Sequence, residues 1–252
     1  MIRDPDLTSN HYIVPDWPAP ARVHAMVTTR EQGVSRPPYD SFNLAAHVGD
    51  QPESVASNRN LLRQQLHLPD EPMWLNQVHG RQIARHGDPG SVPEADGSYS
   101  NQVDQVCVVL TADCLPLLMC NKAGTEVAAV HAGWRGLADG VINSAVDAFT
   151  AAPSELLVWL GPAIGPERFE VGQDVYDAFV TADPAATEGF HAIDDEHWLA
   201  DLYYLARLQL QGLGAGQVYG GQFCTMTDAE RFFSYRRDGV TGRMASLIWL
   251  EN

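Results

Sequence analysis

The sequence between residues 76 and 136 contains three short motifs that organise the chain: NQVHG (76–80), TADC (111–114) and HAGWRG (131–136). Each motif places one side chain that can bind a metal or act as a nucleophile where an apolar run meets a glycine or a proline. These side chains are His79, Cys114 and His131. Such a border is where a strand ends and its loop can carry chemistry on a rigid support.

The three residues are compatible with more than one kind of site. Two imidazoles and one thiolate form a three-ligand set of the kind that catalytic zinc uses, with a fourth position left for water or substrate. The same residues also suit a cysteine nucleophile with a histidine base. A third alternative is a closed structural metal site in a protein that is not an enzyme, which would need a fourth protein ligand. Because the three lie far apart in sequence, they can meet only through the fold.

Composition narrows the possible functions of the chain. It has 252 residues, 45% of them hydrophobic, and a formal net charge of −16. This size and core content suit one domain, and the negative charge argues against binding to nucleic acid or to an anionic membrane. The N-terminus has charges and prolines where a signal peptide would need an apolar stretch. We therefore expect a cytoplasmic protein with reduced cysteines, and we also expect a monomer.

The apolar pattern predicts a chain in which helices and strands alternate only in places. Residues 1–21 read as an extended N-terminal arm, and 22–252 as one catalytic domain. We expect helices over about 53–66, 137–150, 172–180 and 200–214. We expect strands over 23–30, 73–80, 127–130 and 156–160, with a tight turn at 112–114 between two buried extended segments. Residues 217–250 are expected to form strands and loops. With no GxGxxG fingerprint, this order favours a mixed-sheet α/β sandwich over a doubly wound parallel sheet.

Two polar residues beside these motifs are further candidates. Asp113 lies between apolar segments, where an unpaired carboxylate would be costly, so it needs a partner or a ligand. Arg135 stands in a Gly-x-x-Gly loop that opens a helix, an arrangement that suits phosphate or carboxylate. A purely structural turn is an equal alternative for that loop.

Several blocks together resemble one known family. They are SRPPYDSFNLAAHVGD, WLNQVHG, LTADCLPLL, VAAVHAGWRGL, WLGPAIGP with FEVG, and FFSYRRDGVTGRMASLIWL. The chain is similar over residues 22–250 to the YfiH family, also called the laccase-domain or polyphenol oxidase family. The resemblance implies an α/β (α+β) fold, a single-domain α-β-β-α sandwich of mixed sheets related to deamidating bacterial toxins with a Cys-His pair. It also implies that the zinc-binding and catalytic residues fall on His79, Cys114 and His131.

The resemblance implies several activities. One is zinc-dependent purine nucleoside phosphorylase acting on adenosine, inosine, guanosine and methylthioadenosine, with adenosine deaminase activity in the same site. An alternative is hydrolysis of a seryl amide bond in a UDP-muramyl peptidoglycan precursor by Cys114 and His131. The older polyphenol oxidase label is the least favoured, because the chain has 9 histidines and no His-x-His pair to hold several coppers close together. One copper could still occupy the His₂Cys site.

A mechanistic hypothesis assigns roles to the remaining candidates. Zinc at the triple would activate a water molecule or a substrate oxygen. Asp113 would transfer protons in deamination, and Arg135 with its glycine loop would hold phosphate in phosphorolysis. Asn43, Gln77 and Arg236 are expected to contact the substrate, because each is a polar residue within or beside a block of the resemblance.

Overall fold

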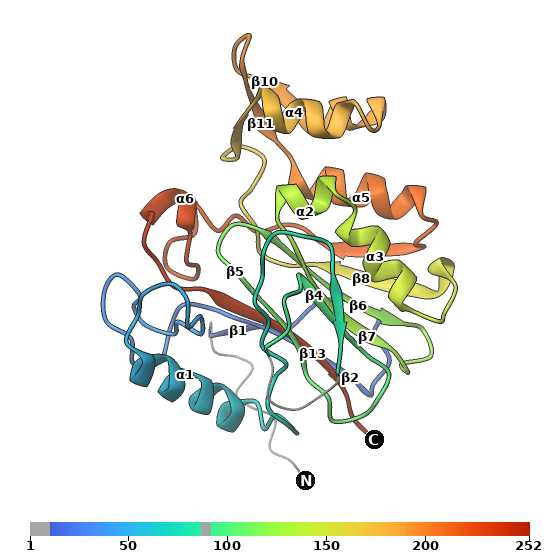
Figure 1. Ribbon diagram of the computed structural model, residues 1–252. Coiled ribbons are helices and arrows are strands. Elements are labelled where there is room, and N and C mark those ends of the chain that lie inside the picture. The colour runs from blue at the N-terminus through green and yellow to red at the C-terminus, as the bar shows by residue number, and fades with distance from the viewer. Residues whose placement is uncertain (1–10, 87–91) are drawn as a thin grey trace.

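The computed structural model describes residues 11–86 and 92–252, and the chain forms four layers (Figure 1). A four-stranded sheet packs on a six-stranded sheet, and helices cover the outer face of each. The mixed-sheet α-β-β-α fold predicted from the sequence is confirmed. Of the predicted N-terminal arm, residues 1–10 lie outside the described residues.

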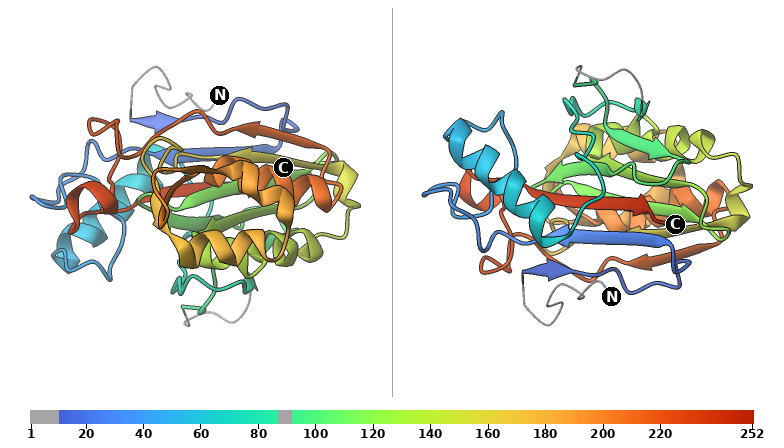
Figure 2. Two further views of the ribbon diagram at one scale, coloured as in Figure 1. Left: turned by 90° about the horizontal axis from the view of Figure 1, so that it is seen from above. Right: turned by 90° about the horizontal axis from the view of Figure 1, so that it is seen from below.

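The four-stranded sheet joins the two ends of the chain. Its strands, in spatial order, are β1 (Tyr12–Ile13), β2 (Val23–Thr28), β13 (Met244–Leu250) and β5 (Cys107–Thr111). All neighbouring pairs are antiparallel. The last strand, β13, lies between β2 and β5, so the C-terminal segment completes the layer from which the TADC turn departs (Figure 2).

The six-stranded sheet is mixed. Its order is β12 (Gln217–Gly220), β8 (Leu156–Leu160), β6 (Leu115–Asn121), β7 (Val127–Ala132), β4 (Gly97–Ser100) and β3 (Ile83–Arg85). The two outer pairs, β12 with β8 and β3 with β4, are parallel, and the three inner pairs are antiparallel. The turn from β5 to β6 therefore carries the chain from one sheet to the other.

Alternating side chains fill the spaces between layers, as the two-residue repeat of a strand requires. Between the sheets, Val109 and Ile248 pack with Leu118 and Trp159. On the opposite face of the four-stranded sheet, alternate residues of β5 and β13 pack against Leu62 and its neighbours on helix α1 (Pro52–Gln65). The helix predicted over 53–66 is thus confirmed as scaffold.

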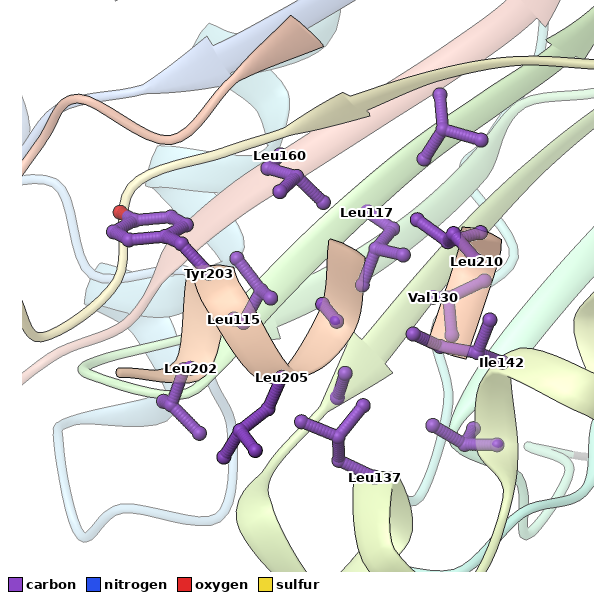
Figure 3. Close-up of a cluster of buried hydrophobic side chains, with 14 of the residues drawn as sticks. Leu115, Leu117, Val130, Leu137, Ile142, Leu160, Leu202, Tyr203, Leu205 and Leu210 are labelled. Carbon is purple, nitrogen blue, oxygen red and sulfur yellow. The ribbon is translucent and has the colours of Figure 1, made fainter. Parts of the chain in front are cut away.

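The outer face of the six-stranded sheet is covered by three helices. They are α2 (Trp134–Ala138), α3 (Val141–Ala148) and α5 (Leu202–Gly212). Figure 3 shows Leu202, Leu205 and Leu210 of α5 in the cluster that also holds Leu117 and Leu160 of the sheet. Gly140, with a φ of 89°, divides the helix predicted over 137–150 into α2 and α3.

A small outlying unit stands beyond α5 at the top of Figure 1. It combines a three-stranded antiparallel sheet, β10 (Phe190–Ala192), β11 (His197–Ala200) and β9 (Glu170–Gly172), with α4 (Gln173–Val180) and the 3₁₀ helix η2 (Pro184–Gly189). Tyr176 stacks on Trp198 at 4.7 Å between ring centroids. A second 3₁₀ helix, η1 (Pro153–Glu155), precedes β8.

Two expectations about local structure were wrong. Residues 73–80 form only isolated bridges, at Met73 and Asn76, in place of a strand. The Gln77 side chain substitutes for a strand ladder: it donates to the carbonyl of Leu110 (2.8 Å) and accepts from its N–H (2.7 Å). Residues 235–238 form a short helix, α6 (Tyr235–Asp238), because the Ser234 hydroxyl accepts from the Arg237 N–H and caps it.

Candidate active site

Cys114 stands at the corner where the chain crosses between the two sheets. It directly precedes β6, and its neighbour Asp113 has a φ of 92°, the left-handed conformation that a tight turn needs. Asp113 is buried, and its carboxylate accepts hydrogen bonds from the Thr225 hydroxyl (2.6 Å) and from the backbone N–H of Arg236 (2.6 Å). The partner that the sequence required for Asp113 is therefore present, and it holds the Cys114 turn against the C-terminal loops.

His131 lies inside β7, where it pairs with Pro116 of β6. The antiparallel register places it beside the start of β6, and therefore beside Cys114. His79 arrives from the other direction, on the loop that follows the isolated bridge at Asn76, with a φ of 61°. The structure thus brings together residues from three separate segments.

The three side chains form a compact cluster. Their ligand atoms all lie within 4.8 Å of one another, and the Cys114 Sγ lies 3.9 Å from the His79 Nε2. The imidazoles meet edge to face, with 4.9 Å between ring centroids. Tetrahedral zinc, with a Zn–S bond of about 2.3 Å and a Zn–N bond of about 2.0 Å, separates sulfur from nitrogen by about 3.5 Å. The Sγ–Nε2 distance of 3.9 Å is close to this value, and two imidazoles with one thiolate are a donor set that suits one divalent ion.

A fully buried carboxylate, Asp96, holds both histidines. Its Oδ1 lies 2.7 Å from the Nδ1 of His131, which makes Nε2 the ring nitrogen available to a ligand. The same carboxylate accepts backbone N–H groups from Val78 (3.2 Å), His79 (2.9 Å) and Gly80 (2.7 Å). One side chain therefore fixes the orientation of one imidazole and the backbone that carries the other, as outer partners of metal ligands commonly do.

The glycines of HAGWRG serve close approach to this cluster. A Cβ placed on Gly133 would lie 2.8 Å from the His79 ring, 3.1 Å from the Cys114 Sγ and 3.5 Å from the His131 ring. Because Gly133 has no side chain, a small space remains there, and all three candidate ligands border it. A Cβ on Gly136 would lie 2.6 Å from the carbonyl oxygen of Gly80. Helix α2 is only one turn long, and the two glycines of this loop contribute by leaving room for the neighbouring residues.

Electrostatics favour a charged pair within the cluster. Burial by itself raises the pKa of the Cys114 thiol, but the facing charge and hydrogen bond of His131, with help from His79, lower it to about 6. Burial likewise opposes protonation of His131, whereas the Cys114 thiolate and Asp96 raise its pKa to about 9. Between these values the pair is a thiolate facing an imidazolium, and a thiolate is the form that binds metals or attacks carbonyls.

Two cavities meet at Cys114. The larger, of about 460 Å³, holds most of the polar groups: it contains the three ligands together with Gln77, His47 and Arg243, and its remaining lining residues are Leu110, Thr111, Ala112 and Tyr235. The smaller, of about 130 Å³, is mostly apolar. Its lining residues are Ala112, Asp113, Cys114, Trp134, Ile164, Phe169, Leu202, Tyr235 and Arg236. A substrate that occupied both would pass the thiol of Cys114, which lines each of them.

The remaining sequence candidates lie at different distances from this centre. Gln77 lines the larger cavity, and its side-chain amide is hydrogen-bonded to the backbone of Leu110. Arg236 lines the smaller cavity, with its guanidinium 5.3 Å from the centre of the Phe169 ring. Asn43 is fully buried behind the cavity wall, where its Oδ1 accepts the Arg243 N–H. Arg135 is exposed, stacks on Trp134 at 4.4 Å, and is not among the lining residues of either cavity.

Sequence reasoning missed Asp96, His47 and Arg243. Asp96 had a usable signal, because it stands where a proline-containing loop meets a buried strand. His47 and Arg243 lie within blocks of the family resemblance, but nothing local to either residue indicates that loops 200 residues apart meet at the cavity.

Within residues 11–86 and 92–252, none of the helices has the length and apolarity needed to span a membrane. The same described residues contain one group of three or more potential metal ligands, the His79, Cys114 and His131 cluster.

Comparison with known proteins places these features in context. The sequence model of the family described as multi-copper polyphenol oxidoreductase laccase matches residues 24–251. A curated relative named purine nucleoside phosphorylase YfiH, from Escherichia coli, is 54% identical over 239 residues, which cover 94% of this chain and 98% of the relative. A purine nucleoside phosphorylase of Pseudomonas aeruginosa is 52% identical over 244 residues, covering 96% of this chain and all of the relative.

Solved structures share the whole fold. A Neisseria meningitidis protein, 51% identical, superposes with a TM-score of 0.93 over 96% of this chain and 100% of its own. The YlmD protein of Geobacillus stearothermophilus, 32% identical, superposes with a TM-score of 0.89 over 94% of each chain.

Proposed function

The chain belongs to the multi-copper polyphenol oxidoreductase laccase family, and from this premise we propose that it is a zinc-dependent purine nucleoside phosphorylase with adenosine deaminase activity. The proposed substrates are adenosine, inosine, guanosine and methylthioadenosine, with inorganic phosphate as co-substrate. The proposed catalytic domain spans residues 22–252. One observation carries the proposal: His79, Cys114 and His131 converge at a cavity in a chain whose relatives are named purine nucleoside phosphorylases.

The donor set supports zinc as the metal. Two imidazoles and one thiolate are typical protein ligands of catalytic zinc, and a fourth position remains for a small ligand. A divalent ion held there supplies a Lewis acid that polarises an oxygen of water or substrate. Copper also suits these ligands. The three-ligand cluster fits one ion, which does not support the several-copper chemistry that the family's description names.

The two cavities support a way of binding the nucleoside. Trp134, Phe169 and Leu202 give the smaller cavity an apolar lining that suits the faces of a purine base. The larger cavity offers polar groups to the ribose and the phosphate. The glycosidic bond would then lie beside Cys114, which lines both cavities together with Ala112 and Tyr235.

The residues around the metal site have proposed roles of their own. Asp96 keeps the His131 Nε2 directed at the site and fixes the backbone of His79. Asp113 is the proposed proton-transfer residue in deamination, since it lines the smaller cavity next to Cys114. Arg236 is a proposed contact to the base on the same side, and Gln77 to the ribose on the other.

One observation favours a second candidate function. Asp96, His131 and Cys114 form a chain of orienting carboxylate, base and nucleophile, the pattern of a thiol amidase. We propose hydrolysis of a seryl amide in a muramyl precursor as this alternative. A Cys114→Ser variant separates the two functions, because zinc content should fall with activity if the thiolate is a metal ligand. Unchanged zinc with lost activity would favour the amidase.

The product of one incubation tests the proposed function. Zinc-loaded protein is incubated with adenosine, with and without phosphate, and the products are identified by mass. Free adenine and ribose 1-phosphate that form only with phosphate would support phosphorolysis, and inosine would support deamination. If neither appears for any of the four nucleosides, the proposal fails and the muramyl precursor becomes the substrate to test.

A further inference from the structure

Arg243 lines the larger cavity and forms no ion pair with a carboxylate of the described residues; the opposite charges that act on it most strongly are those of Cys114 and Asp113. It follows Gly242 just before β13, and its Nη1 donates to the carbonyls of Thr241 (2.9 Å) and Gly242 (3.0 Å). Its Nε and Nη2 have no hydrogen-bond partner among the described residues. Arg30, Arg63, Arg81, Arg231 and Arg237 form ion pairs with carboxylates, whereas Arg243 forms none in the described part of the chain. Part of its guanidinium fork is therefore available to a ligand.

The position of Arg243 is fixed by its surroundings. The side chain is partly buried, and its backbone N–H donates to the Asn43 Oδ1 at 3.0 Å. Asn43 is itself fully buried and also donates to the Asp50 carboxylate at 2.9 Å. The two carbonyl acceptors of Nη1 restrict the guanidinium further. A fork restrained in this way loses little conformational entropy when it binds an anion.

The larger cavity gathers cationic and neutral donor groups in a molecule whose net charge is negative. His47 lines the same cavity, and its pKa is lowered by burial and by the charges of Arg243 and Arg59. In a chain with a net charge of −16, a small anion needs such a local concentration of cationic and neutral donor groups. Carboxylates are absent from the residues that line this cavity.

We propose that Arg243, with His47 beside it, forms an oxyanion subsite that holds inorganic phosphate in the larger cavity. The proposal rests on the proposed phosphorolysis and assigns the co-substrate to residues other than Arg135. Arg135 is exposed and stacked on Trp134, and the loop glycines beside it make room for the histidines. Arg243 instead shares a cavity with all three candidate ligands.

The assignment is consistent with the bonds that phosphorolysis makes and breaks. A phosphate oxygen forms a bond to the anomeric carbon of the ribose, and the bond from that carbon to the purine nitrogen breaks. The electron pair leaves with the purine, which takes up the proton that hydrogen phosphate loses on forming the ester. Arg243 binds phosphate and offsets its charge in the larger cavity, while the purine leaves into the smaller, mostly apolar one.

Kinetics of matched arginine variants test the subsite. Arg243→Met keeps the aliphatic part of the side chain and removes its charge, whereas Arg243→Lys keeps the charge without the guanidinium fork. Arg85→Met is the control, because Arg85 stacks on Tyr99 away from both cavities. We expect Arg243→Met to raise the KM for phosphate by about 10- to 150-fold, the range for a lost hydrogen bond to a charged group. The KM for inosine should change less than twofold, and Arg243→Lys should be intermediate.

A binding measurement makes the test independent of turnover. Broadening of the ³¹P resonance of inorganic phosphate by zinc-loaded protein should be present in the wild type and in Arg85→Met, and lost in Arg243→Met. If nucleosides are not cleaved but this pattern holds, the subsite stands and the proposed function fails. If cleavage occurs and Arg243→Met keeps the wild-type phosphate KM, the subsite is overturned while the function stands. A phosphate defect confined to Arg135→Met would also overturn it.

Discussion

The Asp96 carboxylate lies 2.7 Å from the Nδ1 of His131, and both side chains are buried. Through the N–H of His79 the same carboxylate reaches the second histidine. The relative positions of two candidate ligands therefore depend on one side chain that touches neither the cavity nor the proposed metal.

Asp96→Asn should weaken zinc binding by about 10- to 100-fold, because the substituted amide no longer orients the His131 ring as a carboxylate does. Competition with a chromophoric chelator measures the affinity. Asp194→Asn is a matched control, since Asp194 lies 2.9 Å from the Nδ1 of His197 in an exposed pair. Equal affinities for the Asp96 variant and the wild type would contradict this role.

Gly133→Ala should disrupt the site while leaving the fold in place. The added methyl would lie 2.8 Å from the His79 ring and 3.1 Å from the Cys114 Sγ, so the ligands must separate. We expect activity to fall by about 100-fold, the effect of a displacement of about 1 Å in an active site. Gly212→Ala is the control, because its Cβ would have no neighbour within 4 Å and should raise stability slightly. Full activity in the Gly133 variant would refute the steric argument.

Alkylation of the metal-free protein should report the charge state of Cys114. Thiolate forms as pH rises through the pKa, so the iodoacetamide rate at Cys114 should rise with a midpoint near pH 6 and stay high to pH 9. Cys107 and Cys120 should stay unmodified, because burial raises the pKa of each thiol to about 12. His131→Gln removes the facing charge and should move the midpoint above that of a free thiol. Peptide mapping by mass spectrometry distinguishes the cysteines, and a wild-type midpoint near pH 8.5 would be inconsistent with the charged pair.

Trp134→Ala should raise the KM for nucleosides without affecting the KM for phosphate. Base stacking on an aromatic side chain contributes about 1–3 kcal/mol, so an increase of at least about fivefold is expected. Trp198→Ala removes the same side chain from the outlying sheet, where it stacks on Tyr176, and should leave both constants unchanged. If the phosphate constant alone responds to Trp134→Ala, the two cavities have been assigned in reverse.

Some features of the molecule are determined by residues that are neighbours in sequence, and others by contacts between distant segments. The helix predicted over 53–66 and the place of Cys114 at the start of a strand follow from apolar spacing and turn chemistry within a few residues. His131 was expected just after a strand over 127–130 and instead lies inside β7, which continues to Ala132. Arg135 also looked like an anion-binding residue on local grounds, yet the single turn of α2 directs it to solvent. Arg243 lacks a local signal, because its place at the cavity depends on a hydrogen bond to Asn43, 200 residues away.

Zinc content per chain, measured after zinc loading and desalting, tests the central claim most directly. The wild type and Cys224→Ala, which removes a thiol outside the cluster, should each retain one equivalent, and Cys114→Ala should retain almost none. A Cys114→Ala protein that keeps a full equivalent of zinc would contradict the claim that His79, Cys114 and His131 hold one metal ion together.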